Sequence, residues 1–373
     1  MENCDVLIIG GGPAGSSLAW GLRESGLGVV ILDKKAFPRN KVCAGWITPA
    51  VLETLGIDAE QYRRHHTMQP IHGFRIGRMD GKQVQTRQQQ QPVSFGIRRL
   101  EFDHYLVQRS GARVVAEALQ QLEQNDGGWV VNDRYRAPLL VGAGGHFCPV
   151  ARYLGARPGS GEPTVAAQEI EFAMDQRQLR DCRVDGRFPE LYFCPDLKGY
   201  GWVFRKGDYL NIGLGREDQK RLSEHVRAFC AFLRDSGRLA FDPPARFNGH
   251  AYLLYNHSRR ELARDGVLLV GDAAGLAYPQ SGEGIRPAIE SGLLAAAVVR
   301  AAQGDYRSAT LDAYRQRITE RFGARSAREP LAFLPAGLKR VLAGGLLSTR
   351  WFVENTVINQ WFLHQRQAPL IVE

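Results

Sequence analysis

Hydrophobic and polar positions follow two alternating periodicities along the chain. Residues 5–33 begin with a short apolar run, continue with a helix-like segment and end in a second apolar run, which predicts a strand, a helix and a strand. Further helices are expected at 48–64, 99–125, 219–236 and 285–303, and strands or strands with loops at 70–96, 129–145, 165–215 and 266–285. Residues 308–366 are expected to be mainly helical, interrupted by Pro330 and Pro335.

This interleaving predicts an α/β protein. We expect a Rossmann-type nucleotide-binding domain assembled from separated segments, an inserted antiparallel-sheet domain that binds the substrate, and a helical C-terminal segment. The expected boundaries are 1–65, 95–158 and 258–322 for the nucleotide domain, 66–94 and 159–257 for the inserted domain, and 323–373 for the helical segment. A chain of 373 residues is long enough for two closely connected domains.

Composition narrows the class of protein. The chain is 44% hydrophobic and 23% charged, as is ordinary for a soluble globular protein. Its net charge is +9, but Lys and Arg are scattered and form no basic run with interleaved aromatic residues, so no nucleic-acid partner is expected. A solvated basic surface, attraction to cofactor phosphates and attraction to an anionic membrane all remain open.

Targeting and metal signals are not found in the sequence. The chain enters an apolar strand within its first residues, so no signal peptide is expected, and no apolar run approaches the ~18 residues that span a bilayer. The six cysteines contain no CxxC pair and fit a reducing compartment. His65 and His66 lack companion ligands, so no metal site is expected. We expect a cytoplasmic protein.

The first chemical motif is DVLIIGGGPAGSSLAWGLRESGLGVVILDKK, residues 5–35. Gly10, Gly12 and Gly15 form GxGxxG directly after a strand and open a helix, so they permit a tight turn, the approach of a pyrophosphate and close packing of helix on strand. Asp33 ends the next strand, eighteen positions after Gly15, where an acid can bind a ribose hydroxyl. Strand, glycines, helix, strand and acid in register predict a dinucleotide site.

A second motif identifies the dinucleotide. The segment GVLLVGDAAGLAYPQSGEGIRPAIESG, from residue 266, strongly resembles the second FAD motif of the para-hydroxybenzoate hydroxylase-like flavoproteins. The resemblance implies that Asp272 binds the ribityl chain and that Gly282, Gly284 and Ile285 lie against the isoalloxazine. Backbone N–H groups at a helix start favour negative charge near the flavin ring, which fits this role.

Three further segments resemble the geranylgeranyl reductase family of FAD-dependent oxidoreductases, which has this flavoprotein fold. RNKVCAGWITPAVLETLGI (39–57) resembles its C-x-G-x-x-x-P segment, and GIRRLEFDHYL (96–106) resembles its R-x-x-F-D helix start, which implies that Arg99 lies near FAD. KGYGWVFRKGDYLNIGLG (198–215) resembles its Y-x-W-x-F-P-K-G…N-x-G-x-G strand pair, with Arg205 in place of the proline. The resemblance covers most of residues 1–320.

The segment LLVGAGGHFCPVAR, residues 139–152, departs from the family pattern G-A-D-G-x-x-S-x-V-R. Gly144 stands where the family has Asp, Cys148 where it has Ser and Ala151 where it has Arg, while Arg152 lies one position later and is a candidate to compensate. The resemblance links the missing Asp and Arg to FAD and to transient NAD(P)H contact, so we expect FAD to bind but NAD(P)H to reduce it slowly. His146 is expected to cap or hydrogen-bond rather than to catalyse.

The resemblance implies two sets of site residues. Cys43, Tyr200 and Trp202 are the candidate catalytic residues. Cys43 is either a redox-active or proton-donating thiol or a small packing residue. Tyr200 and Trp202 lie on one face of a strand, where they either line an apolar pocket or belong to the sheet core. The candidate FAD-binding residues are Gly10, Gly12, Pro13, Ala14, Gly15, Asp33, Lys34, Lys41, Ala44, Gly45, Arg99, Gly142, Gly271, Asp272, Pro279, Gly282, Gly284 and Ile285.

The resulting prediction is an FAD-dependent oxidoreductase that takes electrons from NAD(P)H or another transient donor. It would reduce a carbon–carbon double bond of an isoprenoid or similar apolar small molecule. The alternatives are an FAD-dependent monooxygenase acting through a flavin hydroperoxide and a non-catalytic flavin-binding protein. Residues 331–365, with Lys339, Arg340, Arg350, Trp351 and Trp361, fit either peripheral membrane contact or packing against the FAD domain.

Overall fold

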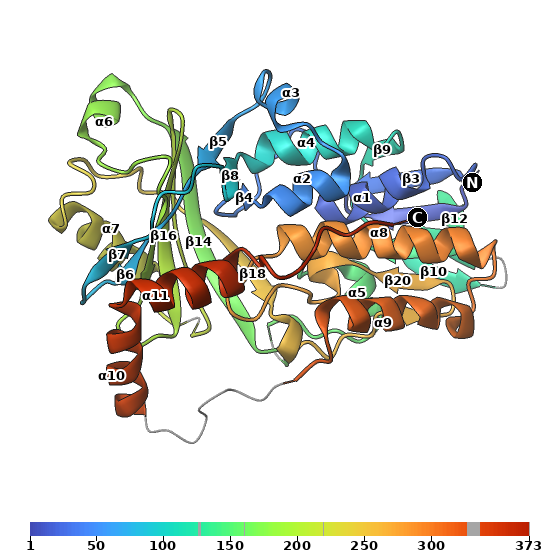
Figure 1. Cartoon of the computed structure of the whole chain (residues 1–373). Helices are drawn as coiled ribbons and strands as arrows, with labels where there is room; N and C mark the ends of the chain where they lie inside the picture. Colours follow the sequence, from blue (N-terminus) through green and yellow to red (C-terminus); the bar gives the residue numbers. More distant parts are fainter. Residues whose placement is uncertain (126–127, 160, 219, 327–335, 373) are drawn as a thin grey trace.

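The computed structural model describes residues 1–125, 128–159, 161–218, 220–326 and 336–372, with the backbone alone for 336–340. Two large sheets dominate it (Figure 1). The first has the strand order β19-β20-β13-β2-β3-β9, and all neighbours are parallel except β19 and β20. Its strands are β2 (Val6–Ile9), β3 (Val29–Asp33), β9 (Arg113–Ala116), β13 (Leu139–Gly142), β19 (Ala263–Arg264) and β20 (Val267–Leu269).

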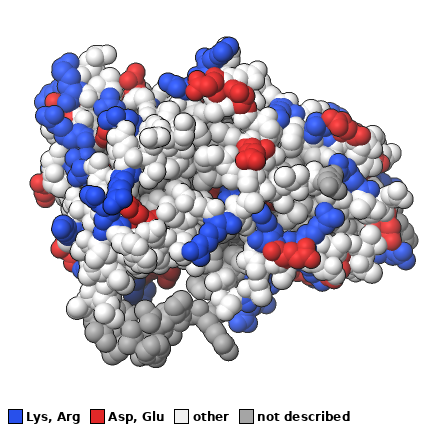
Figure 2. Space-filling model, viewed as in Figure 1, with Lys and Arg blue, Asp and Glu red and all other residues white. Residues whose placement is uncertain are grey.

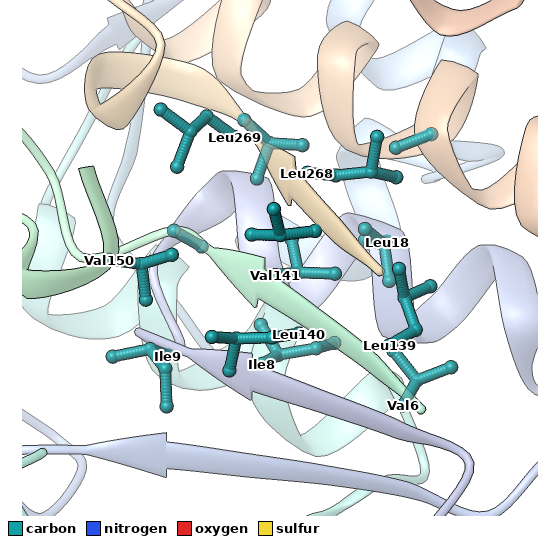
Figure 3. Packing of buried hydrophobic residues seen from close by; sticks show 14 of the residues in the cluster. Val6, Ile8, Ile9, Leu18, Leu139, Leu140, Val141, Val150, Leu268 and Leu269 are labelled. Carbon is teal, nitrogen blue, oxygen red and sulfur yellow. The ribbon is translucent and has the colours of Figure 1, made fainter. Parts of the chain in front are cut away.

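The centre of this sheet is a dry core. Every residue of β2, β13 and β20 is buried, as expected for parallel strands covered on both faces (Figure 3). Helices α1 (Pro13–Leu22) and α8 (Ile285–Ala302) pack closely because Gly292 of α8 faces the backbone of α1. A Cβ added at Gly292 of α8 would lie 2.3 Å from the Ala14 carbonyl oxygen of α1. This close packing holds α1, from the N-terminal motif, against α8, which follows the second motif.

The second sheet has seven mainly antiparallel strands in the order β18-β14-β17-β16-β15-β6-β7. Helix α7 (Leu222–Asp235) packs on one face and, with Phe229 and the apolar sheet residues beneath it, forms a separate core. The opposite face is turned toward the FAD motifs and carries aromatic and charged residues. The strands are β6 (Arg75–Arg78), β7 (Gln83–Gln85), β14 (Thr164–Ala173), β15 (Glu190–Phe193), β16 (Gly199–Lys206), β17 (Tyr209–Arg216) and β18 (Asn248–Leu253).

Smaller elements connect the two sheets and cover their edges. They include a three-stranded sheet in the order β4-β8-β5 and a four-stranded sheet in the order β1-β12-β11-β10. These strands are β1 (Glu2–Asn3), β4 (Trp46–Ile47), β5 (Met68–Ile71), β8 (Ser94–Ile97), β10 (Leu122–Asn125), β11 (Gly128–Val131) and β12 (Tyr135–Ala137). The short helices are α2 (Pro49–Leu55), α3 (Ala59–Arg63), α4 (Arg99–Arg109), α5 (Pro149–Tyr153) and α6 (Gln176–Asp181).

The C-terminal segment crosses between the two halves of the molecule. After α9 (Ser308–Phe322), the described chain resumes with α10 (Ala336–Leu347), α11 (Arg350–Phe352) and the π-helix η3 (Val353–Phe362) (Figure 1). Residues 363–372 then return to the nucleotide domain, where the Leu370 N–H donates to Thr54 Oγ1 at 2.9 Å. Arg286 fixes this return by donating to the carbonyls of Gln367 and Ala368.

The predicted α/β fold class is confirmed, and two of the expected helices are wrong in extent. The helix expected at 99–125 ends at Arg109; Gly111 adopts φ 69° and residues 113–116 instead form β9, paired in parallel with β3. The helix expected at 48–64 is divided into α2 and α3, because Gly56 ends the first in a left-handed conformation and Asp58 caps the second. Pro330 and Pro335 lie outside the described residues, and the domain boundaries stay a prediction.

The surface matches the scattered charge of the sequence. Lys and Arg side chains are interspersed with Asp and Glu on the face shown in Figure 2. Among the described residues, no helix combines the length and the apolar character needed to cross a bilayer. The described part of the chain also contains no group of three or more His, Cys, Asp and Glu side chains arranged to hold a metal ion.

Candidate functional site

The glycine turn after β2 has the shape of a phosphate cradle. A Cβ at Gly15 would lie 2.0 Å from the Gly10 carbonyl oxygen, and one at Gly10 would lie 2.4 Å from the Ala143 carbonyl oxygen, so both glycines are required by close backbone contacts. A Cβ at Gly12 would lie 3.6 Å from Arg39 Nη2, an ordinary contact with the end of a side chain, so no backbone closes over this residue. Pro13 begins α1, and among the described residues no side chain caps it, which leaves the helix N-terminus available to an anion.

Asp33 lies at the carboxyl end of β3, beside this turn, and its carboxylate is hydrogen-bonded within the protein. It accepts from the Gly11 N–H at 3.0 Å, from Lys35 N–H at 3.1 Å and from Arg39 at 3.1 Å. Arg39 was not among the predicted site residues. Lys34, which was, is exposed on the turn that follows the strand.

Arg99 lies at the start of α4 and forms a buried bidentate pair with Asp103, at 2.6 and 2.9 Å. Asp103 also accepts from Arg39 at 3.4 Å, so one carboxylate links Arg99 to the Asp33 region. Burial opposes the charge on Arg99, but Asp103 and the neighbouring Cys43 thiol raise the pKa of the guanidinium above its ordinary value. The structure therefore places Arg99 beside Cys43, at the centre of the predicted site.

Asp272, in the short 3-10 helix η2 (Gly271–Ala273), lies in a second charged cluster. His250 Nε2 lies 3.6 Å from its carboxylate, and Lys41 Nζ lies 2.8 Å from the same imidazole nitrogen. Burial raises the pKa of Asp272, but the hydrogen bond from His250 and the charge of Lys41 lower it to about 2. Burial lowers the pKa of Lys41 to about 8, with Asp272 opposing and Arg99 reinforcing the shift. The structure thus brings Lys41 and Asp272 together, and adds His250.

The second predicted FAD motif packs directly on the first. A Cβ at Gly271, which has φ 59°, would lie 2.9 Å from the Ala14 Cβ. Gly284 precedes α8, and a Cβ there would lie 3.2 Å from Asp272 Oδ1. Gly282 lies against Tyr252, Ile285 is buried at the start of α8, Pro279 is half-buried in the preceding loop, and Gly142 ends β13 against Leu269.

Cys43 lies over the polar face of the seven-stranded sheet. Its sulfur accepts from the Gly45 N–H at 3.4 Å, and its carbonyl accepts from Asn211 Nδ2 at 3.0 Å. Asn211 also donates to Glu169 at 2.8 Å. Gly45 has φ 67°, and a Cβ there would lie 2.3 Å from the Ile97 carbonyl oxygen and 2.5 Å from Lys206 Nζ. Ala44 is half-buried and packs on the adjoining apolar cluster.

Tyr200 and Trp202 lie on one face of β16, as expected; Trp202 belongs to this apolar cluster and Tyr200 packs against it. The Trp202 indole N–H donates to Asn211 Oδ1 at 2.8 Å, and the Tyr200 hydroxyl donates to the Ser281 carbonyl of the second FAD motif. Phe362 of η3 closes the cluster with edge-on contacts to Tyr200 and Trp46. The cluster consists of Trp46, Ile71, Phe74, Ile76, Val84, Ala167, Leu191, Trp202, Phe204, Leu347, Val353, Val357, Ile358, Phe362 and Leu363.

The altered turn after β13 holds a buried charge network. Arg260 is nearly fully buried, pairs with Glu162 at 2.6 and 2.7 Å, and donates to the Asp272 and Ala273 carbonyls. Its Nη2 also donates to His146 Nδ1 at 3.2 Å. Burial and then Arg260 lower the pKa of His146 to about 4, so this imidazole is neutral. His146 is therefore a hydrogen-bonding residue, as predicted, whereas Arg152 is exposed and takes no part in this network.

The fold and these motifs agree with known proteins. A family model described as "FAD binding domain" matches residues 3–326. The chain belongs to this FAD-binding family. It is 27% identical over 333 residues to the digeranylgeranylglycerophospholipid reductase of Methanocaldococcus jannaschii, with 85% of this chain and 82% of that protein covered.

Solved structures show the same fold. A geranylgeranyl bacteriochlorophyll reductase-like protein from Thermoplasma acidophilum superposes with a TM-score of 0.73 at 24% identity, covering 94% of this chain and 88% of that one. A flavin-dependent brominase gives 0.69 at 17% identity, covering 97% and 92%. The protein is an FAD-dependent oxidoreductase, and its predicted resemblance to geranylgeranyl reductases is confirmed.

Several residues of the site were missed by sequence reasoning. Glu169, His250, Arg260 and Glu162 lie outside the glycine motifs, and Arg39 pairs with Asp33 through a loop. Asn211 and Lys206 were visible as matches to the strand-pair motif, which was the available signal, although that motif assigned them no role.

Proposed function

We propose that this FAD-dependent oxidoreductase reduces a carbon–carbon double bond of an isoprenoid or similar apolar substrate. One observation carries the proposal: the buried aromatic cluster around Trp46, Tyr200 and Trp202 begins directly beside Cys43 and the second FAD motif. An apolar substrate that replaced part of this packing would lie between the predicted flavin site and a water-excluding wall. The names of the reductase relatives support the same substrate class.

The residues present fit an FAD molecule in an extended conformation. Gly12 and the uncapped start of α1 would receive the pyrophosphate, and Asp272 with its neighbours Lys41 and His250 would receive the ribityl chain. The start of α8 would face the isoalloxazine. Bound FAD would supply a hydride to one carbon of the double bond, after reduction by NAD(P)H or another donor. The protein would orient the substrate, exclude water and hold the proton for the other carbon.

The deciding experiment is anaerobic. Purified FAD-loaded protein is reduced with dithionite, mixed with a series of isoprenoid alkenes and followed by flavin reoxidation and product mass. Reoxidation without oxygen and a product heavier by two hydrogens support the reductase. Reoxidation only after air is admitted, with a product heavier by one oxygen atom, would instead identify a monooxygenase, and no substrate-dependent reoxidation would favour a non-catalytic flavoprotein.

We further propose that the C-terminal segment touches a membrane surface when it admits the substrate. Between residues 341 and 351 it exposes four large apolar side chains beside the exposed Arg350. Val341 and Trp351 are each 71% exposed, and Leu342 and Leu346 are each 45% exposed. Such a surface suits an interfacial segment. Flotation with anionic liposomes should recover the protein at low salt, and a Trp351→Ser, Leu346→Ser variant should float less. Equal flotation of the variant, or no flotation of either protein, would refute the contact, and the cytoplasmic location stays a prediction.

A further inference from the structure

The face of the seven-stranded sheet that is turned toward the FAD motifs contains a buried carboxyl group outside those motifs. Glu169 lies in β14, is 5% exposed, and is paired across the sheet with Gly213 of β17. The Trp202 indole fills the space above Gly213, where an added Cβ would lie 2.2 Å from the ring. The Glu169 carboxyl group instead reaches Asn211, two residues from Gly213 on β17. Its Oε1 accepts a hydrogen bond from Asn211 Nδ2 at 2.8 Å.

The orientation of the Asn211 amide is set by its other neighbours. The Trp202 indole nitrogen can only donate, and it lies 2.8 Å from Asn211 Oδ1. The amide nitrogen must therefore face the two acceptors, Glu169 Oε1 and the Cys43 carbonyl oxygen. One oxygen of Glu169 is thus held as an acceptor, so the proton of a neutral Glu169 resides on the other oxygen. The same amide ties Glu169 to the backbone of Cys43, beside the predicted flavin site.

Burial keeps this carboxyl group neutral near pH 7. Burial raises the pKa of Glu169 to about 8; Lys206 of β16 opposes the shift, and Glu171 on the same strand reinforces it. Lys206 is itself engaged, because its ammonium donates to Glu171 at 2.9 Å. On β18 the nearest titratable group is His250, which is held by Lys41 and Asp272. The 41–45 segment contributes a backbone N–H from Cys43, which stabilises the ionised form.

The pair formed by Glu171 and Lys206 leads from the buried site to the surface. Burial raises the pKa of Glu171, but Lys206 and Arg98 together lower it below its ordinary value, so Glu171 is ionised. Arg98 donates to Glu171 at 3.2 Å and to Glu101 at 2.8 Å, and the side chains of all three are partly exposed. Two carboxyl groups two residues apart on one strand therefore have opposite protonation states, one buried and neutral, the other ionised and near water.

We propose that Glu169 holds the proton that the reduction consumes, that Asn211 positions it beside Cys43, and that Glu171 and Lys206 return a proton to it from solvent. This inference rests on the proposed reduction of a double bond. In that reaction one carbon receives a hydride from two-electron-reduced FAD and the other receives the Glu169 proton. A C–H bond forms at each carbon as the π bond breaks. The carboxylate left behind regains a proton from water, and the external donor reduces FAD again.

The first test needs no substrate and uses FAD-loaded protein. The midpoint potential of the flavin is measured from pH 6 to pH 9.5, a range chosen to bracket the pKa of about 8. In the wild-type protein the plot of potential against pH should break near that pKa, because negative charge on the reduced flavin favours protonated Glu169. Glu169→Gln should remove the break while FAD stays bound. An unchanged break in Glu169→Gln would overturn the proposal.

Glu171→Gln is the matched control on the same strand. It leaves Lys206 facing Glu169 alone and removes the repulsion between the two carboxylates, so the break should remain but move to lower pH. This variant tests the proposal even if Glu169→Gln does not fold. A break that stays at the wild-type pH would contradict an assignment of the break to Glu169. The infrared difference spectrum between oxidised and reduced protein should contain a carboxylic acid band that Glu171→Gln keeps and Glu169→Gln loses.

The second test uses an alkene substrate identified by the anaerobic screen. We expect Glu169→Gln to lower kcat at least tenfold with little change in KM or in the rate at which dithionite reduces FAD. Wild-type kcat should fall above about pH 8, and in Glu171→Gln the fall should begin at lower pH. A wild-type kcat for Glu169→Gln would overturn the role in turnover. If no alkene is reduced by any form, the proposed function fails, whereas the potential and infrared measurements still decide the protonation of Glu169.

Discussion

Two glycine-containing turns lie side by side at one edge of the six-stranded sheet. One follows β2 and the other follows β13, and these strands are parallel neighbours in register, with Ile9 opposite Gly142. The first turn leads into α1, a helix of ten residues, and the second leads into α5, a helix of five. β2 and β13 therefore each begin a strand–turn–helix unit with its turn at this edge, and of these two only the first has the complete GxGxxG pattern.

The two turns differ in what stabilises them. The first is shaped by backbone contacts, since Gly10 and Gly15 have no room for a Cβ. The second is surrounded by side chains that come from elsewhere in the chain: Arg260 and Glu162 form a buried ion pair, and His146 accepts a hydrogen bond from it. This turn has Gly144 and Ala151 where the family pattern has Asp and Arg, and a guanidinium from a distant segment contacts it. The comparison teaches that position on a sheet does not determine how a turn is stabilised.

The largest expected effect is at the ion pair of the second turn. Arg260→Met should lower the free energy of unfolding by about 3–5 kcal/mol, because the Glu162 carboxylate, only 13% exposed, loses its partner, and His146 and the Asp272 and Ala273 carbonyls lose their donor. Arg152→Met, at the exposed arginine of the same turn, should change it by no more than about 0.5 kcal/mol. Denaturant unfolding of FAD-loaded protein measures both. The double variant Arg260→Met, Glu162→Gln should recover part of the loss, and no recovery would mean that Arg260 acts through its carbonyl contacts instead.

The next largest effect compares a glycine that is enclosed by backbone, Gly15, with one that has free space beside it, Gly145. Gly15→Ala should cost about 2–3 kcal/mol and weaken FAD retention, because its Cβ would lie 2.0 Å from the Gly10 carbonyl oxygen. Gly145→Ala should cost about 1 kcal/mol, from its φ of 78° alone, since no described atom lies within 4 Å of the added Cβ. Unfolding free energies and FAD dissociation constants test this pair. Equal losses for both variants would remove the distinction between the turns.

These two turns also show what the sequence could and could not predict. The first turn was found because strand, glycines, helix and Asp33 are consecutive, so local spacing carries the information. The charge network of the second turn was not predicted, because Arg260 and Glu162 are 98 positions apart and meet only in the folded chain. Lys41 and His250, 209 positions apart, were missed as a pair for the same reason.

Secondary structure was misjudged where pairing between strands overrides local preference. Residues 110–125 contain helix-forming residues, yet residues 113–116 pair with β3 and extend the parallel sheet. A local signal for the end of α4 was present in Ser110 and Gly111, and the Ser110 hydroxyl accepts from the Ala112 N–H. Glu169 could not be singled out at all, since an acid within a strand is ordinarily placed on a solvent-facing side.

A smaller effect should follow from the pH dependence of His146. Its pKa is about 4 in the folded protein against 6.5 for the free imidazole, so the unfolded chain binds more protons between these values. Stability should therefore fall as pH is lowered from about 6.5 toward 4, by at most about 3 kcal/mol from this residue. His146→Gln should have a shallower slope over that window. Parallel slopes for wild type and His146→Gln would show that His146 does not titrate on unfolding.

The smallest expected effect concerns the electron donor and would make the second turn more like its family. Wild-type protein should hold FAD well but be reduced slowly by NADH and NADPH, because Gly144 and Ala151 replace two charged residues of the family pattern. Restoring Arg at position 151 is not useful, since Ala151 is fully buried. Gly144→Asp is possible only with slight movement, because its Cβ would lie 3.3 Å from both the Cα and the Sγ of Cys148, and Cys148→Ser relieves only the contact with the sulfur. With Arg260 already nearby, we expect the double variant to accelerate reduction by NAD(P)H about tenfold, or about 1.4 kcal/mol in the barrier.

Stopped-flow reduction measures the rate, with dithionite as the control that should not change. Rapid saturable reduction of the wild type at micromolar NADH or NADPH would show that the donor does not depend on this turn.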